Sequence, residues 1–565
     1  SNSFCTLLEM TVKHVLAIAV VVLVGAVSCA VSARRSGSRG GVTDDKYHTT
    51  WKAALFVPCT GNVTLRADAF VPTPKHSGEK FPVVIFPNSW GCPQIEYITR
   101  ALGLAERGYV AMEYETRGWF TSQGQIDTAG PLDRQDGSTM IDFVASKAAE
   151  WNADMSKVAF MGISYGAGIS LEMAGHDERV TTAIAMSGWN NMTLMMYGNE
   201  APNTDVLQGL VDAAERDGNV THQLQGIVDG LKNHTNMAAF SAFTETRSPQ
   251  IFLEQFNVRK VPLMLSSNYL DHLFRPQYMH AFFELLTGPK LMLLNQGTHA
   301  LPEGLGVLVH DNFIWSHAFA WLDRWLKNNT DNGIMSEPEI QAQLGNSVFD
   351  ATYVPYSRAN KSTVSLWPTP VDAQSGQGGL SADGTALPSG TSAPIHFTTH
   401  VGLKEGDGKD LSFGKPDNVS LVQPAESTIV FVSGALSQDK SLTLCGTPEL
   451  DFRIETSADD WQLYTFMYRV PSGTSARYGD LWSRGFYNHY ASGPTAGPAA
   501  TRNADGSYSV KGAQLHTICK TVEPGDRLAL GVVLYDRRFT PASTNVSVAF
   551  VYGADTELRV PFVTY

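Results

Sequence analysis

A serine in the first third of the chain stands in a spacing that suits nucleophilic chemistry. Gly162, Ser164 and Gly166 form the pattern Gly-x-Ser-x-Gly, which is typical of a serine at a sharp turn between a strand and a helix. Glycine is common in this chain, with 50 among 565 residues, so chance alone can produce the pattern. Ser164 is therefore either a nucleophile or a small packing residue in a turn, and its surroundings must decide.

A serine hydroxyl attacks only when a base takes its proton, and an acid commonly orients that base. Asp271 follows the apolar run VPLMLSSNYL, and His299 follows the run LMLLNQGT. If both runs are strands, the three side chains gather at the carboxyl edge of one sheet, in the chain order serine, acid, histidine. We therefore predict Ser164 as the nucleophile, His299 as the base and Asp271 as the orienting acid.

Each of these assignments has a competing interpretation. Asp271 could only cap the helix that follows it, and His299 could lie in a surface loop. Ser187 lacks the flanking glycines and is expected to line a pocket. At the start of the helix after Ser164, the backbone N–H of Tyr165 is the predicted oxyanion donor. The other histidines that could act as bases are His272, His280, His310 and His317.

Short β-rich runs alternate with helical segments from about residue 50 to residue 330, which is typical of a doubly wound α/β domain. The strand-like run KVAFMGIS leads directly into the Gly-x-Ser-x-Gly pattern, and YGAGISLEMAGH after it is rich in small and helix-forming residues. Ser164 therefore has the strand, turn and helix context that its motif requires. We assign residues 47–333 to this domain.

Residues 190–257 interrupt the alternation, because apolar residues recur there at helical spacing. We predict a small helical cap inserted after a sheet strand. From residue 335 to residue 565 the chain is β-rich, with Gly, Pro and Ser at the turns, which predicts a β-sandwich or jelly-roll domain. The predicted fold class is thus α/β with a helical cap insertion, followed by an all-β jelly roll.

The sequence from Met10 onward predicts a secretory signal peptide. Lys13 and His14 precede an apolar run over residues 15–27, and small residues suit cleavage after Ala33, so residues 1–33 are a predicted signal peptide. An uncleaved anchor over residues 15–33 is an alternative, although the arginines that follow would then favour a cytosolic body. A lipidated Cys29 is a second alternative. After cleavage, no membrane association is expected.

Sequons and cysteines also favour secretion or the secretory pathway. Depending on the organism, the final location would be extracellular, lysosomal or periplasmic. After removal of the leader, the even number of cysteines predicts the disulfides Cys59–Cys92 and Cys445–Cys519. Four free thiols in a reducing compartment are the alternative. Asn-x-Ser/Thr sequons, more numerous than chance supplies, begin at Asn62, Asn191, Asn219, Asn233, Asn328, Asn360, Asn418 and Asn545.

Charge and composition narrow the classes of partner. A net charge of −13 and a pI near 5.6, without a stretch rich in Lys and Arg, argue against nucleic acid and anionic membranes. A small-molecule ester or short peptide substrate fits better. The sequence has no metal-ligand spacing and no phosphate-binding loop, so we predict neither a metal nor another cofactor.

Several segments resemble the X-Pro dipeptidyl-peptidase and cocaine-esterase family of serine hydrolases, also called peptidase S15 or CocE/NonD hydrolases. GISYGAG is similar to the family's nucleophile segment, SNYLDHLF to its acid segment, NQGTH to its histidine segment, and PGDRLALGVVLYD to a late strand of its jelly roll. The resemblance covers nearly all of the chain beyond the leader. It implies an α/β-hydrolase domain, a cap and a jelly roll, with the active site between them.

One position departs from the family pattern. Family members commonly place a tyrosine hydroxyl as the second oxyanion donor, whereas the matching stretch FPNSWGC has Trp90. The indole N–H of Trp90, or a backbone N–H between Ser89 and Gly91, would have to replace it. Trp90 as a hydrophobic pocket wall is the alternative, and a Cys59–Cys92 bridge would hold this loop.

The resemblance leaves the substrate open among X-Pro peptides, esters and amides. A dipeptidyl-peptidase needs a carboxylate for the substrate's free amine, for which Glu200 and Asp205 are candidates. An esterase is favoured because the expected pocket walls are aromatic: Trp90, Trp189, Tyr269 and Phe274. The alternatives are an X-Pro dipeptidyl-peptidase and a non-enzymatic secreted binding protein on the same fold.

Overall fold

The computed structural model describes residues 46–308, 312–345, 347–356, 361–384, 387–396, 418–420, 428–435, 439–475, 478–492, 497–536, 539 and 541–563. The predicted signal peptide, Cys29, His310 and the sequon at Asn360 lie outside these residues. Over the described part of the chain, no helix has both the length and the apolar character that a bilayer crossing requires.

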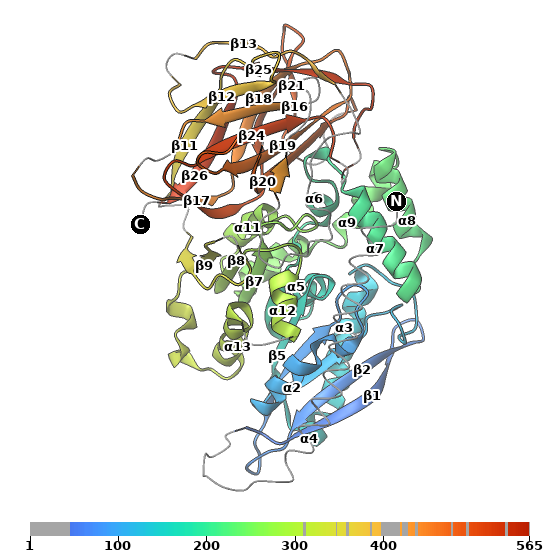
Figure 1. Ribbon diagram of the computed structural model, residues 1–565. Helices are drawn as coiled ribbons and strands as arrows, with labels where there is room; N and C mark the ends of the chain where they lie inside the picture. The colour runs from blue at the N-terminus through green and yellow to red at the C-terminus, as the bar shows by residue number, and fades with distance from the viewer. Residues whose placement is uncertain are drawn as a thin grey trace.

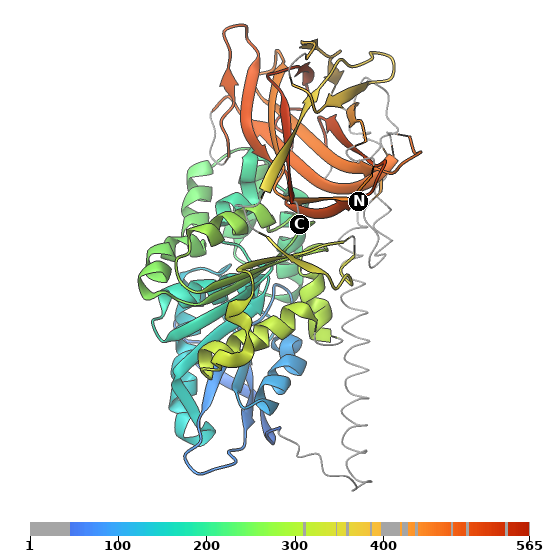
Figure 2. The same ribbon diagram turned by 90° about the vertical axis from the view of Figure 1, so that its left-hand side faces the viewer.

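A mixed sheet forms the centre of the first domain (Figures 1 and 2). Within the described residues it has ten strands in the order β1-β2-β4-β3-β5-β6-β7-β8-β9-β10. Neighbours from β4 to β9 run parallel, whereas β1, β2 and β10 join antiparallel. The strands are β1 (Thr49–Cys59), β2 (Val63–Pro72), β3 (Phe81–Pro87), β4 (Val110–Tyr114), β5 (Ala153–Ile163), β6 (Val180–Met186), β7 (Leu263–Asn268), β8 (Lys290–Asn295), β9 (Ile340–Gln343) and β10 (Tyr353–Pro355).

Helices cover both faces of this sheet. Ile85 of β3 belongs to the core formed with α3 (Pro131–Ser146) and α5 (Tyr165–His176), whereas its neighbour Phe86 belongs to the core formed with α2 (Ile98–Glu106) and α13 (Phe313–Leu326). Successive residues of a strand point to opposite faces. Since both faces are covered, the central strands are continuous apolar runs, which is why the sequence shows them clearly.

A group of helices lies between β6 and β7, where the sequence predicts a cap. Leu207, Val211, Leu224 and Val228 are buried at helical spacing and pack these helices together. The last of them, α10, continues to Arg259 and packs against α5. The elements are α6 (Met192–Tyr197), η2 (Gly198–Glu200), α7 (Thr204–Asp217), α8 (His222–Lys232), α9 (Met237–Glu245), η3 (Pro249–Phe252) and α10 (Leu253–Arg259).

Within the described residues, the C-terminal part consists of strands, in agreement with the predicted fold class, and runs from yellow to red in Figure 1. Its core includes Phe431, Trp461, Trp482 and Phe550. Its strands are β11 (Lys361–Pro368), β12 (Gln377–Ser381), β13 (Gly390–Thr391), β14 (Ile395–His396), β15 (Asn418–Ser420), β16 (Thr428–Ser433), β17 (Leu442–Gly446), β18 (Glu449–Glu455), β19 (Trp461–Val470), β20 (Tyr478–His489), β21 (Thr501–Arg502), β22 (Tyr508–Gln514), β23 (Ile518–Val522), β24 (Arg527–Val533), β25 (Ser547–Tyr552) and β26 (Glu557–Val563).

The first domain extends further along the chain than the sequence predicts. β9 and β10 lie beyond residue 335, yet β9 pairs in parallel with β8, with Met292 opposite Ile340. These two strands are short, so their pattern of apolar and polar residues does not distinguish them from the β-rich sequence that follows. The sheet therefore continues to Pro355.

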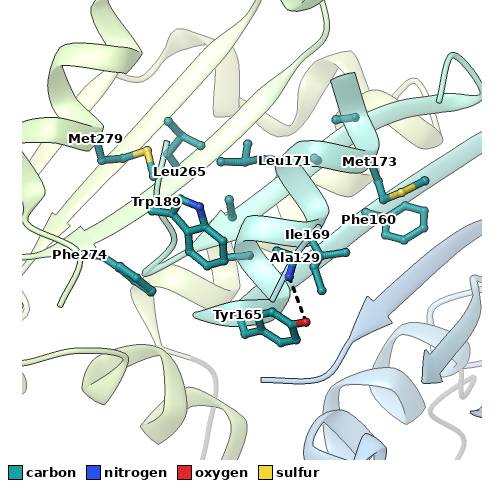
Figure 3. Close-up of a cluster of buried hydrophobic side chains, with 14 of the residues drawn as sticks. Ala129, Phe160, Tyr165, Ile169, Leu171, Met173, Trp189, Leu265, Phe274 and Met279 are labelled. Atoms are coloured by element: carbon teal, nitrogen blue, oxygen red, sulfur yellow. Dashed lines mark hydrogen bonds between the residues drawn. The ribbon is translucent and has the colours of Figure 1, made fainter. Parts of the chain in front are cut away.

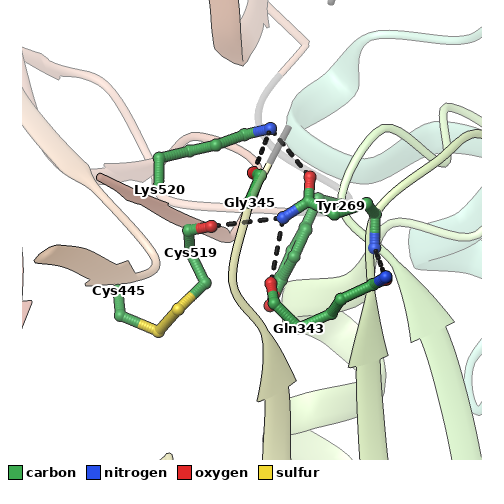
Figure 4. Close-up of a disulfide and its surroundings, with 7 residues drawn as sticks. Tyr269, Gln343, Gly345, Cys445, Cys519 and Lys520 are labelled. Atoms are coloured by element: carbon green, nitrogen blue, oxygen red, sulfur yellow. Dashed lines mark hydrogen bonds between the residues drawn. A yellow bond between two sulfur atoms is a disulfide. The ribbon is translucent and has the colours of Figure 1, made fainter. Parts of the chain in front are cut away.

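A disulfide lies close to the contact between the two domains (Figure 4). Cys445 of β17 and Cys519 of β23 are directly opposite in the antiparallel register and are bonded. Gln296, which follows β8, donates from Nε2 to the carbonyl of Cys519 at 3.2 Å, and Lys520 Nζ donates to Gln296 Oε1 at 2.7 Å. The all-β domain thus holds the first residue of the loop that leads to His299.

The other predicted disulfide is wrong, because Cys59 and Cys92 carry free thiols. β2 and β4 separate β1, which ends at Cys59, from β3, which precedes the loop with Cys92. Two intervening strands place β1 and β3 roughly 14 Å apart, whereas bonded cysteines need Cα atoms within about 7 Å. Burial raises the pKa of the Cys59 thiol to about 12 and that of Cys92 well above its ordinary value.

Candidate active site

The strand-to-helix turn places Ser164 in a strained conformation. Ser164 follows β5 directly and has φ 57° and ψ −115°, a combination that is costly for any residue with a side chain. Its N–H donates to the carbonyl of Met186 on β6 at 2.9 Å, and its own carbonyl accepts the N–H of Gly168 at 3.1 Å. These bonds hold the serine at the tip of the turn.

The two motif glycines are required by close backbone packing. A Cβ on Gly162 would lie 2.7 Å from the carbonyl carbon of Gly166, and a Cβ on Gly166 would lie 2.3 Å from the carbonyl oxygen of Pro87 at the end of β3. Carbon cannot approach these atoms so closely without displacing the backbone. The glycines therefore let β5, α5 and β3 meet at the serine.

The predicted acid and base lie beside Ser164, each just after a neighbouring strand. His299 Nε2 is 2.7 Å from Ser164 Oγ, and His299 Nδ1 is 2.7 Å from Asp271 Oδ2. The other oxygen of Asp271 accepts the backbone N–H groups of Leu273 at 2.9 Å and Phe274 at 2.8 Å. Asp271 is fully buried. Its carboxylate thus both caps the turn that follows and orients the imidazole.

The charge of the acid favours the protonated imidazole. Burial lowers the pKa of His299, but the charge and hydrogen bond of Asp271, with a further contribution from Glu303, raise it more, so the net shift is upward. A raised pKa makes the ring a stronger acceptor for the serine proton. The arrangement is therefore suited to general base catalysis.

The alternative bases that the structure describes lie elsewhere. His317 bonds to Glu337 and to the carbonyl of Phe313. His280 packs edge-on against Tyr356, and His272 lies beside His516 of the all-β domain. Over the described residues, no group of three or more His, Cys, Asp or Glu side chains is arranged to hold a metal ion.

One of the two predicted oxyanion donors is bonded elsewhere. The hydroxyl of Tyr165 donates to Asp133 at 2.7 Å and accepts the N–H of Ala129 at 3.1 Å (Figure 3), which fixes the ring. Among the described residues, no group accepts the backbone N–H of Tyr165. Trp90, in contrast, donates its indole N–H to the carbonyl of Leu210 in α7 at 2.9 Å. The indole is therefore engaged with the cap, and Trp90 as a side-chain oxyanion donor is wrong.

The half-buried carboxyl group of Glu96 holds the loop around Trp90. Glu96 accepts the N–H of Ser89 at 2.8 Å and contacts the Ser89 hydroxyl at 2.7 Å, and the same hydroxyl lies 2.9 Å from the carbonyl of Ile163, the residue before Ser164. Burial raises the pKa of Glu96 to about 7, although the Ser89 bonds lower it. Since the Ser89 N–H is occupied, the prediction of a backbone donor in this loop narrows to the N–H groups of Trp90 and Gly91. Sequence patterns did not reveal Glu96.

The aromatic residues predicted to line a pocket divide into two groups. Trp189 and Phe274 lie together with ring centroids 5.1 Å apart (Figure 3), and Phe274 packs edge-on against His299 at 4.8 Å. Tyr269 is fully buried and its hydroxyl donates to the carbonyl of Gln343 at 3.3 Å, in the region of the disulfide (Figure 4). Tyr269 is therefore a contact between β7 and β9 and not a pocket wall.

Comparisons with known proteins agree with this geometry. Residues 61–301 match the family model described as X-Pro dipeptidyl-peptidase (S15 family). The resemblance to the S15 family is confirmed. This stretch, an S15-type hydrolase domain, contains Ser164, Asp271 and His299. A search of curated proteins gives no match.

Three solved structures share the fold over most of the chain. A CocE/NonD family hydrolase from Staphylococcus aureus has 13% identity and a TM-score of 0.63, over 94% of this chain and 99% of its own. An aminopeptidase from the marine sediment archaeon Thaumarchaeota archaeon has 13% identity and a TM-score of 0.64, over 94% and 99%. An alpha-amino acid ester hydrolase has 14% identity and a TM-score of 0.62, over 93% and 98%. At these identities the likeness establishes the fold alone.

The glycine contacts predict a specific loss of stability. Gly166→Ala should lower the free energy of unfolding by about 1–3 kcal/mol, because its Cβ would overlap the Pro87 carbonyl. Gly226→Ala, inside α8 with nothing within 4 Å of the added Cβ, is the matched control and should stabilise by up to about 1 kcal/mol. Urea unfolding measures both; equal effects would show that the close packing at Gly166 is not a constraint.

Proposed function

We propose that the chain is a serine hydrolase that cleaves a carboxylic ester through an acyl-enzyme. The observation that carries this proposal is the continuous hydrogen-bonded line from Asp271 through His299 to Ser164, with 2.7 Å at each step. A strained serine at the end of this line supports a catalytic role, because such strain persists where the surrounding structure enforces it. A non-enzymatic binding protein would have no use for it.

Each group then has a defined role. Ser164 Oγ attacks the carbonyl carbon of the substrate while His299 Nε2 takes its proton, and Asp271 stabilises the imidazolium that forms. The backbone N–H of Tyr165, with that of Trp90 or Gly91, binds the oxyanion. The imidazolium returns its proton to the leaving alcohol as the acyl-enzyme forms. Water, activated by His299, then attacks the acyl carbon and releases Ser164.

The first test is labelling of the nucleophile. A fluorophosphonate probe should label the wild type and should not label Ser164→Ala. Because only the neutral imidazole takes the serine proton, and the pKa of His299 is raised, the labelling rate should fall on acidification with a midpoint above about 6.5, the ordinary value for histidine. Labelling that persists in Ser164→Ala would exclude Ser164 as the nucleophile.

The surroundings of the base support an ester with an apolar group. Phe274 packs edge-on against His299, and Trp189 packs on Phe274, so aromatic rings lie on this side of the histidine. Glu200, one candidate for binding a substrate amine, is only 2% exposed, and its charge acts on Tyr487 and Tyr490 of β20 in the all-β domain. Asp205, the other candidate, is exposed in the first turn of α7. Neither carboxylate therefore favours the X-Pro dipeptidyl-peptidase alternative.

Substrate preference is tested by direct comparison. The kcat/KM for a short-chain aryl ester should exceed that for an X-Pro-arylamide by at least about tenfold, because the ester needs no amine-binding carboxylate. The control is the same arylamide with a blocked N-terminus. A preference for the arylamide that disappears on blocking would establish the dipeptidyl-peptidase instead.

We further propose that the protein enters the secretory pathway. The Cys445–Cys519 disulfide supports this location, since disulfides persist in oxidising compartments. Exposed side chains at the described sequons Asn62, Asn219, Asn233, Asn328 and Asn545 support it as well.

The sequons differ in a way that glycan mapping can detect. After secretion from a eukaryotic host, peptide mass spectrometry should find glycans at the exposed Asn62, Asn328 and Asn545. Asn191 should be unmodified, because its side chain accepts the N–H of Leu194 as the N-cap of α6. Retention inside the cell without any glycan would contradict the secretory proposal.

A further inference from the structure

A second buried carboxylate lies four residues beyond the base. Glu303 is in α12 (Leu301–Leu308) and is fully buried. Its Oε1 accepts the hydroxyls of Ser187 at 3.0 Å and Ser266 at 2.5 Å, and its Oε2 accepts Asn268 Nδ2 at 2.9 Å. Ser187 follows β6, and the other two donors lie at the end of β7. Glu303 thus gathers the ends of two strands of the central sheet.

The same donors hold the chain on both sides of His299. Asn268 Nδ2 also donates to the carbonyl of Thr298 at 3.1 Å, and Ser187 Oγ accepts the N–H of Ala300 at 3.3 Å. Ala300 has φ 56°, which is unfavourable for a residue with a side chain. The loop conformation that aims the imidazole at Ser164 is therefore maintained by these bonds and not by local preference.

The arrangement of protons in this network requires an acceptor at Glu303. Ser187 and Ser266 have one hydroxyl proton each, and both point to Oε1. Ser187 Oγ already accepts the N–H of Ala300, and the two hydrogens of Asn268 Nδ2 serve Glu303 Oε2 and the carbonyl of Thr298. A carboxylate satisfies all of these donors, whereas a protonated acid would compete with them. Burial raises the pKa of Glu303 above its ordinary value, and the hydrogen bonds from Ser266, Asn268 and Ser187 offset only part of that rise.

The negative charge of Glu303 reaches the base. It raises the pKa of His299 together with Asp271, which is the nearer carboxylate. The other groups that face the imidazole are the hydroxyl of Ser164 and the ring of Phe274, neither of which carries a charge near neutral pH. Glu303 also faces the phenol of Tyr353, whose pKa burial and this charge raise. The imidazolium formed during acylation is therefore stabilised by two negative charges, that of Asp271 and that of Glu303.

We propose that Glu303 is a positioning residue for the reaction, which holds the loop of His299 through Ser187, Ser266 and Asn268 and supplies a second negative charge to the imidazolium. This inference rests on the proposed function, since it assigns a role to Glu303 only if His299 is the base. It does not depend on whether the substrate is an ester or a peptide.

The test separates the charge of Glu303 from its hydrogen bonds. In Glu303→Gln the charge is lost, so the acidic limb of the rate of fluorophosphonate labelling should move to lower pH by about half to one unit, and the plateau rate should fall about tenfold as the loop loosens. In Glu303→Asp the charge stays but the shorter side chain cannot reach all three donors. There the plateau should fall while the limb stays near the wild-type position.

The outcomes distinguish this inference from the proposed function. If Ser164→Ala is labelled as fast as the wild type, the proposed function fails. If labelling depends on Ser164 but Glu303→Gln leaves both the limb and the plateau unchanged, only the role of Glu303 fails. If Glu303→Gln lowers the melting temperature but leaves the acidic limb of the labelling rate in place, the carboxylate is purely structural. This result would also overturn the proposed role of Glu303. If Glu303→Gln does not fold, Ser187→Ala, which keeps the charge and removes the acceptor for Ala300, should lower the plateau without moving the limb.

Discussion

The close contact of three backbone segments at Gly166 determines the rest of the site. Gly166 lies against the carbonyl of Pro87, so α5 begins directly beside the end of β3. Ser164 takes its strained conformation because β5 must turn into α5 within this contact. The loop after Pro87 contains Ser89 and Trp90. The proposed nucleophile and the loop proposed to supply the second oxyanion donor are thus positioned by one close approach of two backbone segments, which a single added methyl group would push apart.

The half-buried Glu96 and the fully buried Glu303 support this arrangement from opposite ends. Glu96 bonds to Ser89, whose hydroxyl also lies near the carbonyl of Ile163, immediately before Ser164. Glu303 joins strand ends to the residues on either side of His299. Buried carboxylates are costly unless their oxygens are satisfied. Both accept several short hydrogen bonds, which makes them compatible with a buried site and fixes the loops that they bond.

The proximity of Asp271 and His299 to Ser164 could be predicted from sequence because the strands that precede them lie in apolar runs. Parallel strands end at a common edge, so the order of Ser164, Asp271 and His299 along the chain nearly determines their proximity. The direction of a side chain after a strand end is not determined in this way. Trp90 bonds to the cap and Tyr269 packs toward β9, because each packs against residues far away in the sequence.

The predictions of the Cys59–Cys92 disulfide and of the domain boundary near residue 335 were wrong for the same reason. The even count of cysteines says nothing about the two strands that separate β1 from β3. β9 joins the first sheet by pairing with β8, although its sequence resembles the β-rich text that follows. Strand order across a sheet is a property of long-range packing, and short strands contribute little periodicity to show it. Glu303 could not be predicted either, since a single acidic residue in the apolar helix LPEGLGVL does not indicate which residues it contacts.

The all-β domain is part of the framework of the active site. Gln296, three residues before His299, bonds to the carbonyl of Cys519 and accepts Lys520 Nζ. Burial lowers the pKa of Lys520 to about 8, because removing the ammonium group from water is unfavourable. Its hydrogen bonds to Gln296 and to the carbonyl of Gly345 offset part of this desolvation cost. The loop of the base is therefore fixed at its beginning by the second domain and at its end by Glu303. Its conformation depends on both domains, and loss of either anchor would misalign the imidazole without altering Ser164 or Asp271.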